Sequence, residues 1–322
     1  MASSLPFTPT RSPPITSSSS PISLHFPLPS NTPSEHVADV QGRIAVLTLS
    51  NPSKLNAVGL QDVFTLIETL TWLGEQDRVT IVVVTGEGRF FSSGAMLDDK
   101  SRDSGLPAEA HTSGKPEDVK RINEHYISRI TLGNGRLARV LTEFPKVLVG
   151  AMNGPAVGIM AAFVGHCDLL YAYENFWLNV PFSQLGLVCE GLASQTFVAK
   201  MGLGRAQECL LEGKRMDAQT LAATGFITRL LPTPASASTA DKASTLPILQ
   251  EVLTHIGERL MPPNADAYAL TYSKRLIQRV TYDHLTREEA NQAELRGAEQ
   301  VFTSGVPLRQ FARMAQSKKS KM

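Results

Sequence analysis

Two segments rich in small residues each follow an apolar, strand-like run, and their composition is typical of turns that expose backbone N–H groups. The first runs from Phe90 to Leu97 after the run Thr80–Thr85, and the second from Asn153 to Ile159 after the run Lys146–Met152. Backbone N–H groups at two such strand-to-helix turns can donate to one carbonyl oxygen, and glycine or alanine lets that oxygen approach closely. The pair therefore predicts an oxyanion hole, and with it a reaction through an enolate or a tetrahedral oxyanion.

One carboxylate, Glu190, stands among apolar neighbours further along the chain. Val188 and Cys189 precede it, Leu192 follows, and the stretch Gly191–Phe197 predicts a helix that Glu190 opens. Apolar surroundings raise the pKa of a carboxyl group, which suits a base that takes a proton from a weakly acidic C–H. A helix N-terminus has the opposite effect, because it favours the charged form. The alternative is a solvated acid in the first turn of a helix.

The segments that must position these residues alternate between strand and helix patterns. Besides the two apolar runs above, strands are predicted over Ile44–Leu49, Asp168–Ala172 and Phe176–Leu178, and helices over Val58–Leu73, Glu117–Phe144, Val157–Gly165, Gly191–Met201, Ala206–Leu211 and Asp217–Ala223. This alternation predicts an α/β fold with a mostly parallel sheet. From Leu246 onward the pattern is helical only.

The chain divides into parts of different composition. Residues 1–35 form a Ser- and Pro-rich tail that is predicted to be disordered, residues 36–231 the α/β core, 232–245 a linker loop, 246–316 a helical region and 317–322 a basic tail. A mitochondrial presequence would carry several arginines on a helix. The first segment has Arg11 alone and many prolines, so a mitochondrial location is the less favoured alternative.

The last three residues, Ser320-Lys321-Met322, differ from the Ser-Lys-Leu peroxisomal address only by Met in place of Leu. Because Met is apolar and of similar bulk, we expect this tripeptide to bind the peroxisomal import receptor and to place the protein in the peroxisome. The alternative is a basic tail without a targeting role.

Composition argues against several other classes of protein. Lys and Arg total 31 against 30 Asp and Glu and form no basic stripe, so no nucleic-acid partner is expected. No apolar run is long enough to span a bilayer. The three cysteines and the stretch His166–Asp168 lack the spacing of a metal site. Gly133–Ala138 matches a loose dinucleotide motif but follows no strand, and the G-x-S-x-G elbow of serine hydrolases is absent.

Four stretches in register resemble the crotonase (enoyl-CoA hydratase/isomerase) superfamily: Asn51–Asn56, Phe91–Ala95, Asn153–Gly158 and His166–Asp168. The resemblance implies an α/β crotonase-like ββα spiral core with a helical C-terminal oligomerisation region that assembles trimers or hexamers. It also implies an acyl-CoA substrate that carries the coenzyme A itself, with no further cofactor and no metal. The oxyanion donors would be the N–H groups of Ala95 and Ile159.

The same resemblance implies where the coenzyme A would run. Its path would be lined by Lys54, Leu55, Asn56, Ser93, Gly94, Met96, Leu97 and Gly158. Lys54 and Arg89 could pair with its phosphates, and Lys274 is a further possibility.

The reaction depends on which acids are present. Hydratases of this superfamily use two glutamates, and the matching positions here are Ala162 and Phe182, so hydration is not expected. Glu190 resembles the single proton-carrying glutamate of the Δ3,Δ2-enoyl-CoA isomerase branch. The resemblance thus implies an isomerase of fatty acid β-oxidation. Two alternatives stay open: a related enzyme for a polyketide- or toxin-derived acyl-CoA, and a non-catalytic acyl-CoA-binding member.

Overall fold

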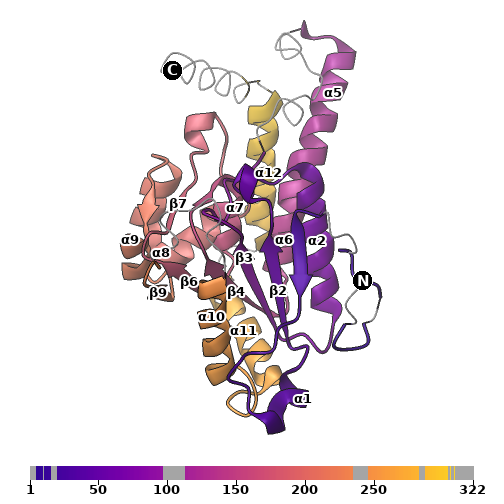
Figure 1. Cartoon of the computed structure of the whole chain (residues 1–322). Coiled ribbons are helices and arrows are strands. Elements are labelled where there is room, and N and C mark those ends of the chain that lie inside the picture. The colour runs from indigo at the N-terminus through magenta and orange to yellow at the C-terminus, as the bar shows by residue number, and fades with distance from the viewer. Residues whose placement is uncertain are drawn as a thin grey trace.

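The computed structural model describes residues 5–9, 11–15, 20–96, 113–234, 246–282, 287–303, 305 and 308. Its centre is a six-stranded sheet in the order β1–β2–β3–β4–β6–β9 (Figure 1). The strands are β1 (Ile22–His25), β2 (Ile44–Leu49), β3 (Ile81–Gly86), β4 (Val147–Met152), β6 (Leu169–Tyr173) and β9 (Arg229–Leu231). β1 is antiparallel to β2 and the other neighbours are parallel, which confirms the expected α/β fold with a mostly parallel sheet.

The central strands are apolar along their whole length because the sheet is covered on both faces. Every residue of β2, β3 and β4 is buried. Successive side chains alternate between two cores: Leu47 and Val84 belong to one, and Val46 and Val83 to the other. Burial on both faces removes the alternation of polar and apolar residues that marks a half-exposed strand.

Helices supply the covering layers. One core includes side chains of α2 (Leu60–Glu75), α6 (Arg136–Thr142), α7 (Gly158–Val164) and α8 (Ala193–Leu210), and the other includes α10 (Leu246–Arg259) and part of α11 (Ala267–Tyr282). Figure 1 shows α10 and α11 together at the lower end of the sheet, apart from α2 and α6. The remaining short helices include α1 (Val37–Val40) and α9 (Ala218–Ala223).

A second, smaller sheet lies next to the segment that follows β3 and includes a strand from the segment that follows β4. It contains β5 (Ala156–Val157), β7 (Trp177–Asn179) and β8 (Met216–Asp217), and a parallel bridge connects Ala156 of β5 to Ser92. Because β3 and β4 are parallel neighbours, the turns that follow them start at the same edge of the main sheet. The two small-residue segments are therefore brought together.

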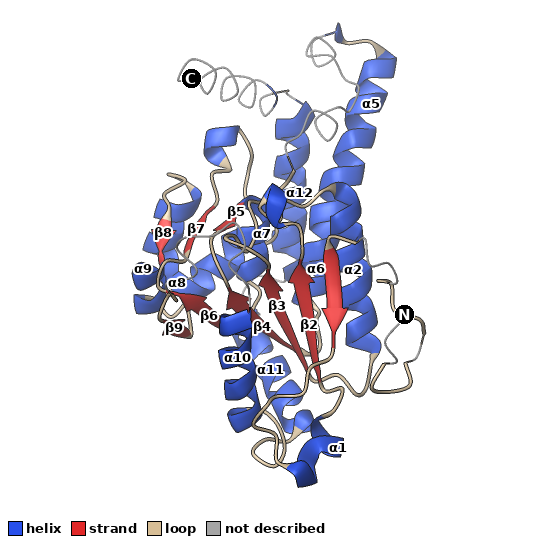
Figure 2. Cartoon of the chain, in the orientation of Figure 1, coloured by secondary structure: helices blue, strands red, loops and turns tan. Residues whose placement is uncertain are grey.

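A long helical segment stands beside this edge. It runs from α5 (Pro116–Tyr126) through a π-helical stretch, Ile127–Gly135, into α6. The sequence predicted one helix over Glu117–Phe144; the helical extent is confirmed, but the wider π coil was not anticipated. α12 (Arg287–Thr303) packs along α5 and the π-helical stretch, and Figure 2 shows it standing next to them.

The prediction of a disordered N-terminal segment is wrong for much of it. Residues 22–25 form β1 and pair with β2, and Ile22 is buried. The rings of Phe7 and Phe26 pack against Trp72 of α2. These spaced apolar side chains provide enough buried surface to order a segment whose overall composition is Ser- and Pro-rich.

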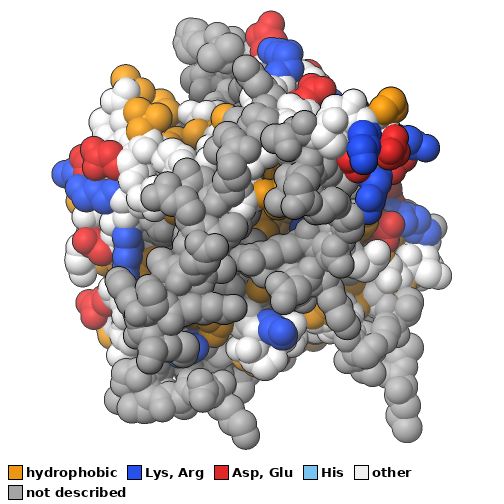
Figure 3. All heavy atoms as spheres, turned by 90° about the horizontal axis from the view of Figure 1, so that it is seen from above, with side chains coloured by type: hydrophobic (Ala, Val, Ile, Leu, Met, Phe, Trp, Pro, Cys, Tyr) orange, Lys and Arg blue, Asp and Glu red, His pale blue; other side chains and the backbone are white. Residues whose placement is uncertain are grey.

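The other predicted divisions fall partly outside the described residues. Residues 235–245 of the linker and the whole basic tail 317–322 lie outside them, whereas the described part of 246–316 is helical apart from short connections. In the part of the chain that the structure describes, no helix has the length and hydropathy of a membrane span. On the described part of the face in Figure 3, acidic and basic side chains are mixed around the edge instead of gathered by sign.

Candidate active site

The turn after β3 directs the N–H of Ala95 away from the neighbouring chain segment. A parallel bridge joins Val58 and Ala95. Its hydrogen bonds come from the flanking residues, since the Val58 N–H donates to the Gly94 carbonyl and the Met96 N–H donates to the Val58 carbonyl, each at 2.9 Å. In a parallel pair the N–H of the central residue then faces the other side. Ala95 is itself exposed, so this face is open to a ligand.

The turn after β4 lies directly against the first turn. A Cβ at Gly94 would come within 2.8 Å of the Val157 carbonyl oxygen, and the φ of Gly94 is +91°, so only glycine fits there. Gly158 then opens α7 with a φ of +57°. Ile159 follows in the first turn of α7, where an N–H has no partner within the helix. Two N–H groups, each preceded by a glycine with positive φ, thus lie on adjoining turns.

Glu190 lies in the loop before α8, and its neighbour contacts the second turn. A Cβ at Gly191 would be 3.0 Å from the Cδ1 of Ile159 and 3.0 Å from the Cβ of Ala162. Glu190 is buried, with 6% of its surface exposed. The sequence predicted that Glu190 opens the helix, but α8 begins at Ala193. The carboxylate therefore belongs to a loop that lies close to Ile159.

Asn134 is a residue of this site that sequence reasoning missed. Its amide Nδ2 donates to Oε2 of Glu190 at 2.6 Å. Asn134 belongs to the π-helical stretch Ile127–Gly135, and such departures from α-helical geometry frequently occur at functional sites. In the sequence, the same residue appeared only within the rejected dinucleotide motif. The amide fixes one carboxylate oxygen of Glu190.

Glu190 and Asn134 line a small cavity beneath α12. Most of its other side chains are apolar: Ile130 from the π-helical stretch and Leu295 and Ala298 from α12. The carboxylate therefore faces a lining in which apolar side chains stand beside the amides of Asn134 and Asn291.

His166 anchors the Glu190 loop through the backbone. Its Nε2 lies 2.8 Å from the Gly191 carbonyl oxygen, and because a carbonyl only accepts, Nε2 carries the proton. Burial lowers the pKa of His166 to about 4, so the ring is neutral at neutral pH. His166 thus donates a constant hydrogen bond to the residue that follows Glu190.

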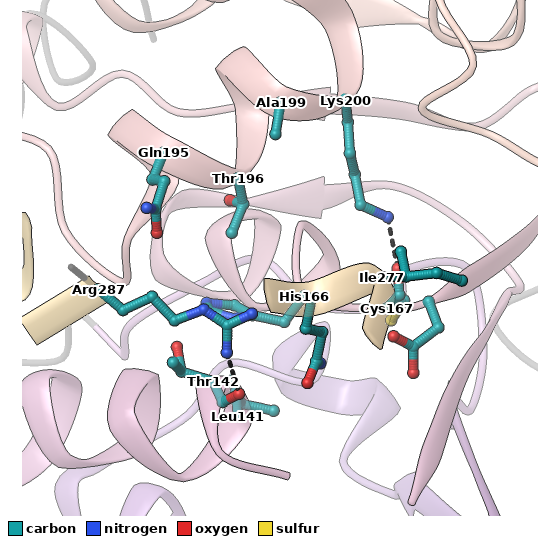
Figure 4. Close-up of a pocket in the computed structure, with 12 residues that line it drawn as sticks. Leu141, Thr142, His166, Cys167, Gln195, Thr196, Ala199, Lys200, Ile277 and Arg287 are labelled. Atoms are coloured by element: carbon teal, nitrogen blue, oxygen red, sulfur yellow. Dashed lines mark hydrogen bonds between the residues drawn. The ribbon is translucent and has the colours of Figure 1, made fainter. Parts of the chain in front are cut away.

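A second, larger pocket also has His166 in its wall. Figure 4 shows Lys200 reaching from α8 to the Cys167 carbonyl, and the Arg287 guanidinium directed at Thr142. Burial raises the pKa of the Cys167 thiol to about 12, so this thiol stays protonated. Among the described residues, no group of three or more His, Cys, Asp or Glu side chains could hold a metal ion.

Several predicted substrate-binding residues lie beside the oxyanion turn. Lys54 is exposed and ends a 3-10 turn over Pro52–Lys54, and Leu55 follows with a φ of 52°. The Leu55 carbonyl accepts from the Ser93 N–H at 2.9 Å. The Asn56 side chain is buried and bonded to the backbone of Asn51, Glu87 and Phe90. Asn56 therefore holds these loops together, and its backbone alone is left for a ligand.

The remaining predicted binding residues are more scattered. Arg89 is exposed and Met96 half-buried, whereas Leu97 lies outside the described residues. The suggestion that Lys274 binds phosphate is wrong: its Nζ lies 2.7 Å from Oδ2 of Asp168 and donates to the Lys146 carbonyl at 2.7 Å. With 6% of its surface exposed, Lys274 is a buried structural cation.

The two positions matched to hydratase glutamates hold side chains that cannot carry a proton. Ala162 is fully buried and Phe182 is 4% exposed. Because the Cβ of Ala162 faces Gly191, an acid there would stand beside Glu190. In this chain a methyl group occupies that place.

The layered sheet, the linked turns and the C-terminal helices define a crotonase-type fold. The crystal structure of an enoyl-CoA hydratase from Mycobacterium avium subsp. paratuberculosis K-10 has a TM-score of 0.65 at 22% sequence identity, over 91% of this chain and 96% of that one. The family model described as enoyl-CoA hydratase/isomerase matches residues 39–125 and 117–245. The chain belongs to this family.

Two curated relatives span almost the same length. A protein of Pyricularia oryzae named Delta(3,5)-Delta(2,4)-dienoyl-CoA isomerase is 34% identical over 87% of this chain and 96% of its own length. A Saccharomyces cerevisiae protein named 3,2-trans-enoyl-CoA isomerase is 27% identical over 85% of this chain and 92% of its own length.

Proposed function

We propose that this protein is an enoyl-CoA isomerase that moves the double bond of a 3-enoyl-CoA to the trans-2 position in fatty acid β-oxidation. The observation that carries the proposal is the placement of one buried carboxylate, Glu190, beside the turn that presents the Ile159 N–H. The two relatives described above are both named as isomerases of unsaturated acyl-CoAs, which supports the same reaction class.

The first part of the mechanism is polarisation of the thioester. Its carbonyl oxygen accepts from the N–H groups of Ala95 and Ile159, which makes the C2 protons more acidic. Charge gathers on this oxygen as the dienolate forms, so donors that are already in place stabilise the transition state more than the ground state.

The second part is proton transfer by one base. Glu190 removes a proton from C2, and the electrons of the C2–H bond form a C1=C2 bond while negative charge moves to the thioester oxygen, which gives a dienolate. Glu190 then returns the proton to C4 as the C1 carbonyl forms again, which leaves the double bond between C2 and C3. One carboxylate suffices because C2 and C4 are only two carbons apart and can face the same oxygen. Asn134 holds the other oxygen still. These steps use a base and two N–H donors, so we propose no cofactor besides the coenzyme A of the substrate.

The coenzyme A would run along the turn that carries Ala95. Its binding is assigned to the residues predicted from the sequence: Lys54, Leu55, Asn56, Arg89, Ser93, Gly94, Met96, Leu97 and Gly158. Lys54 and Arg89 are both exposed, so their side chains could pair with the phosphates of coenzyme A. We expect a change that removes the charge at either residue to raise KM and leave kcat nearly unchanged.

The proposal is tested with cis- and trans-3-enoyl-CoA and with 2-enoyl-CoA, by recording double-bond migration and hydration separately. We expect migration to trans-2-enoyl-CoA and little hydration. Strong hydration would contradict the inference that Ala162 and Phe182, at the positions of the two hydratase glutamates, prevent hydration. Tight acyl-CoA binding without turnover would instead indicate the non-catalytic member.

A second candidate is isomerisation of a 3,5-dienoyl-CoA to the 2,4-dienoyl-CoA, because the Pyricularia oryzae relative bears that name. This reaction carries a proton from C2 to C6, which is further than one carboxylate readily spans. Among the described residues that line the small cavity, Glu190 is the one carboxylate, which favours the shorter transfer. Comparing kcat/KM for 3-enoyl- and 3,5-dienoyl-CoA of equal chain length decides between them.

Location and assembly are also part of the proposal. Ser320-Lys321-Met322 would address the protein to the peroxisome, and deletion of this tripeptide from a fluorescent fusion should abolish punctate import. The C-terminal helices would assemble a trimer or hexamer, which light scattering on the purified protein measures.

A further inference from the structure

The larger pocket beside His166 has no part in the proposed reaction, and its wall is positively charged. The pocket lies between α6, α8, α11 and α12 and has a volume of about 190 Å³, well above the space that one water molecule needs. Lys200 and Arg287 are cationic residues of its wall, and Asp168 is the one acid among the described residues that line it. The charges of the wall therefore do not balance.

The carboxylate of Asp168 is already engaged by a different cation. Its Oδ2 lies 2.7 Å from the Nζ of Lys274 and also accepts from the Leu148 N–H at 2.8 Å. Lys274 is buried, so this pair is a fixed part of the fold. Asp168 thus balances the charge of Lys274 and does not balance that of Lys200.

Lys200 is a cation without a carboxylate beside it. Its ammonium group donates to the Cys167 carbonyl and lies 5.6 Å from the centre of the Phe226 ring. In the part of the chain that the structure describes, no carboxylate lies within ion-pair distance of Lys200. Burial lowers its pKa, because the charged form loses hydration. An ammonium group carries three N–H donors, so Lys200 can bind an anion and keep its bond to Cys167.

Arg287 reaches the same pocket from another element. It is the first residue of α12, and its guanidinium donates to the Thr142 carbonyl. Figure 4 shows Arg287 and Lys200 entering the pocket from different sides. Burial is the main cause of the low pKa of His166, and the positive charges of Lys200 and Arg287 lower it further, so both charges act on one part of the pocket. Uncharged hydrogen-bonding side chains complete the wall: Gln195, Thr196 and Gln278.

We infer that this pocket is a binding site for a small tetrahedral oxyanion of the phosphate type, held by Lys200 and Arg287. Guanidinium and ammonium groups form their strongest hydrogen bonds with anionic oxygens. Because the two cations come from different elements, an anion with oxygens in several directions can reach both, whereas a carboxylate presents two oxygens in one plane. The site is separate from Lys54 and Arg89, so it goes beyond the proposed function.

The test is equilibrium dialysis of the purified protein against radiolabelled inorganic phosphate at constant ionic strength. Lys200→Met and Arg287→Gln each remove one charge from the pocket. Lys54→Met is the matched control, because it removes the same charge from an exposed lysine that is proposed to pair with coenzyme A. We expect one phosphate per native chain, with affinity at least about tenfold weaker in Lys200→Met and in Arg287→Gln, as for loss of one charge-assisted hydrogen bond. Lys54→Met should bind phosphate as the native protein does.

Three results would overturn the inference. The first is no saturable binding of phosphate by the native protein. The second is a loss of binding in Lys54→Met alone, which would place the phosphate in the coenzyme A path. The third is displacement of phosphate by an equal concentration of acetate, which would contradict a site for a tetrahedral anion. Arg287→Gln keeps an N–H donor for the Thr142 carbonyl, so it decides the question if Lys200→Met does not fold. None of these results depends on isomerisation of an acyl-CoA.

Discussion

Asn134 holds Glu190 through a carboxylate oxygen, and His166 holds the loop that carries it through the Gly191 carbonyl. This arrangement matters because a base that serves both C2 and C4 must keep one oxygen over the substrate throughout the reaction. A freely rotating carboxylate would spend most of its time in unproductive orientations.

Replacing Asn134 with Leu should therefore lower kcat more than it alters KM. The change removes the donor to Oε2 and leaves the base loosely held, and we expect a loss of about tenfold to a hundredfold in kcat, in line with other positioning hydrogen bonds. Asn134→Gln, which keeps an amide on a longer side chain, should recover part of the loss. Steady-state kinetics with trans-3-decenoyl-CoA measures both, and an unchanged kcat in Asn134→Leu would refute the positioning role.

The lowered pKa of His166 predicts that the stability of the folded protein depends on pH. Its folded-state pKa is about 4, against the ordinary 6.5, so between these values the unfolded chain binds a proton that the folded chain does not. Stability from this group is complete above pH 6.5 and declines as the pH falls towards 4, by about 3 kcal/mol in all.

Urea unfolding of the native protein and of His166→Gln from pH 7 to pH 4 checks this expectation. Glutamine keeps an N–H donor for the Gly191 carbonyl but does not titrate. The stability of the native protein should fall more steeply with acid than that of the variant. Parallel curves would show that His166 is not buried as a neutral ring.

At the scale of elements, the site depends on two turns that fit only when a glycine separates them. Gly94→Ala should place a Cβ 2.8 Å from the Val157 carbonyl oxygen and strain a backbone φ of +91°. Since the turns must then move apart, the two N–H donors lose their common target, and we expect kcat/KM to fall by about 10²–10³, as for loss of an oxyanion donor.

The matched control is Gly225→Ala, which also has positive φ, at +85°, but has no atom within 4 Å of the added Cβ. It should cost stability without a comparable loss of activity. Circular dichroism would be used to check that both variants fold. If Gly94→Ala retained native kcat/KM, the two-turn oxyanion hole would be wrong.

The elements also show what the sequence can and cannot reveal. The apolar runs predicted β2, β3 and β4 because burial on both faces makes such runs continuous. β1 was missed because its residues belong to a Ser- and Pro-rich segment, and β5 and β8 because two-residue strands have no periodicity.

For the site, Ala95, Ile159 and Glu190 could be proposed from motifs, since small residues and a lone acid leave a local pattern. Asn134 and Asn291 could not. Asn134 reaches the site through the π-helical stretch, and Asn291 through the packing of α12 beside the cavity. A π-helical stretch and a distant packing contact leave no local pattern in the sequence. The sequence analysis set His166 aside as a metal ligand but could not find its role, because its partner, the Gly191 carbonyl, is a backbone group.

At the scale of the whole molecule, Lys274 fastens α11 to the sheet. It pairs with Asp168, and the Asp168 carboxylate also accepts from the Leu148 N–H at 2.8 Å. Lys274→Met would remove the cation from Asp168 and leave the Lys146 carbonyl without this donor, and we expect a loss of about 1–3 kcal/mol in the free energy of unfolding. Arg139→Met, which breaks an exposed pair with Glu288, should cost about 1 kcal/mol or less. Equal losses in urea unfolding would contradict the structural role of Lys274.

The most direct test of the central claim is the rate of double-bond migration in Glu190→Gln. The measurement is a single-turnover experiment with trans-3-decenoyl-CoA and enzyme in excess, with binding of the saturated decanoyl-CoA recorded to show that the site is intact. Because Glu190 is proposed as the one proton carrier between C2 and C4, the variant should bind the acyl-CoA normally and lose at least about 10³-fold in rate, within the range of general acid–base catalysis. Migration at close to the native rate in Glu190→Gln would contradict the account.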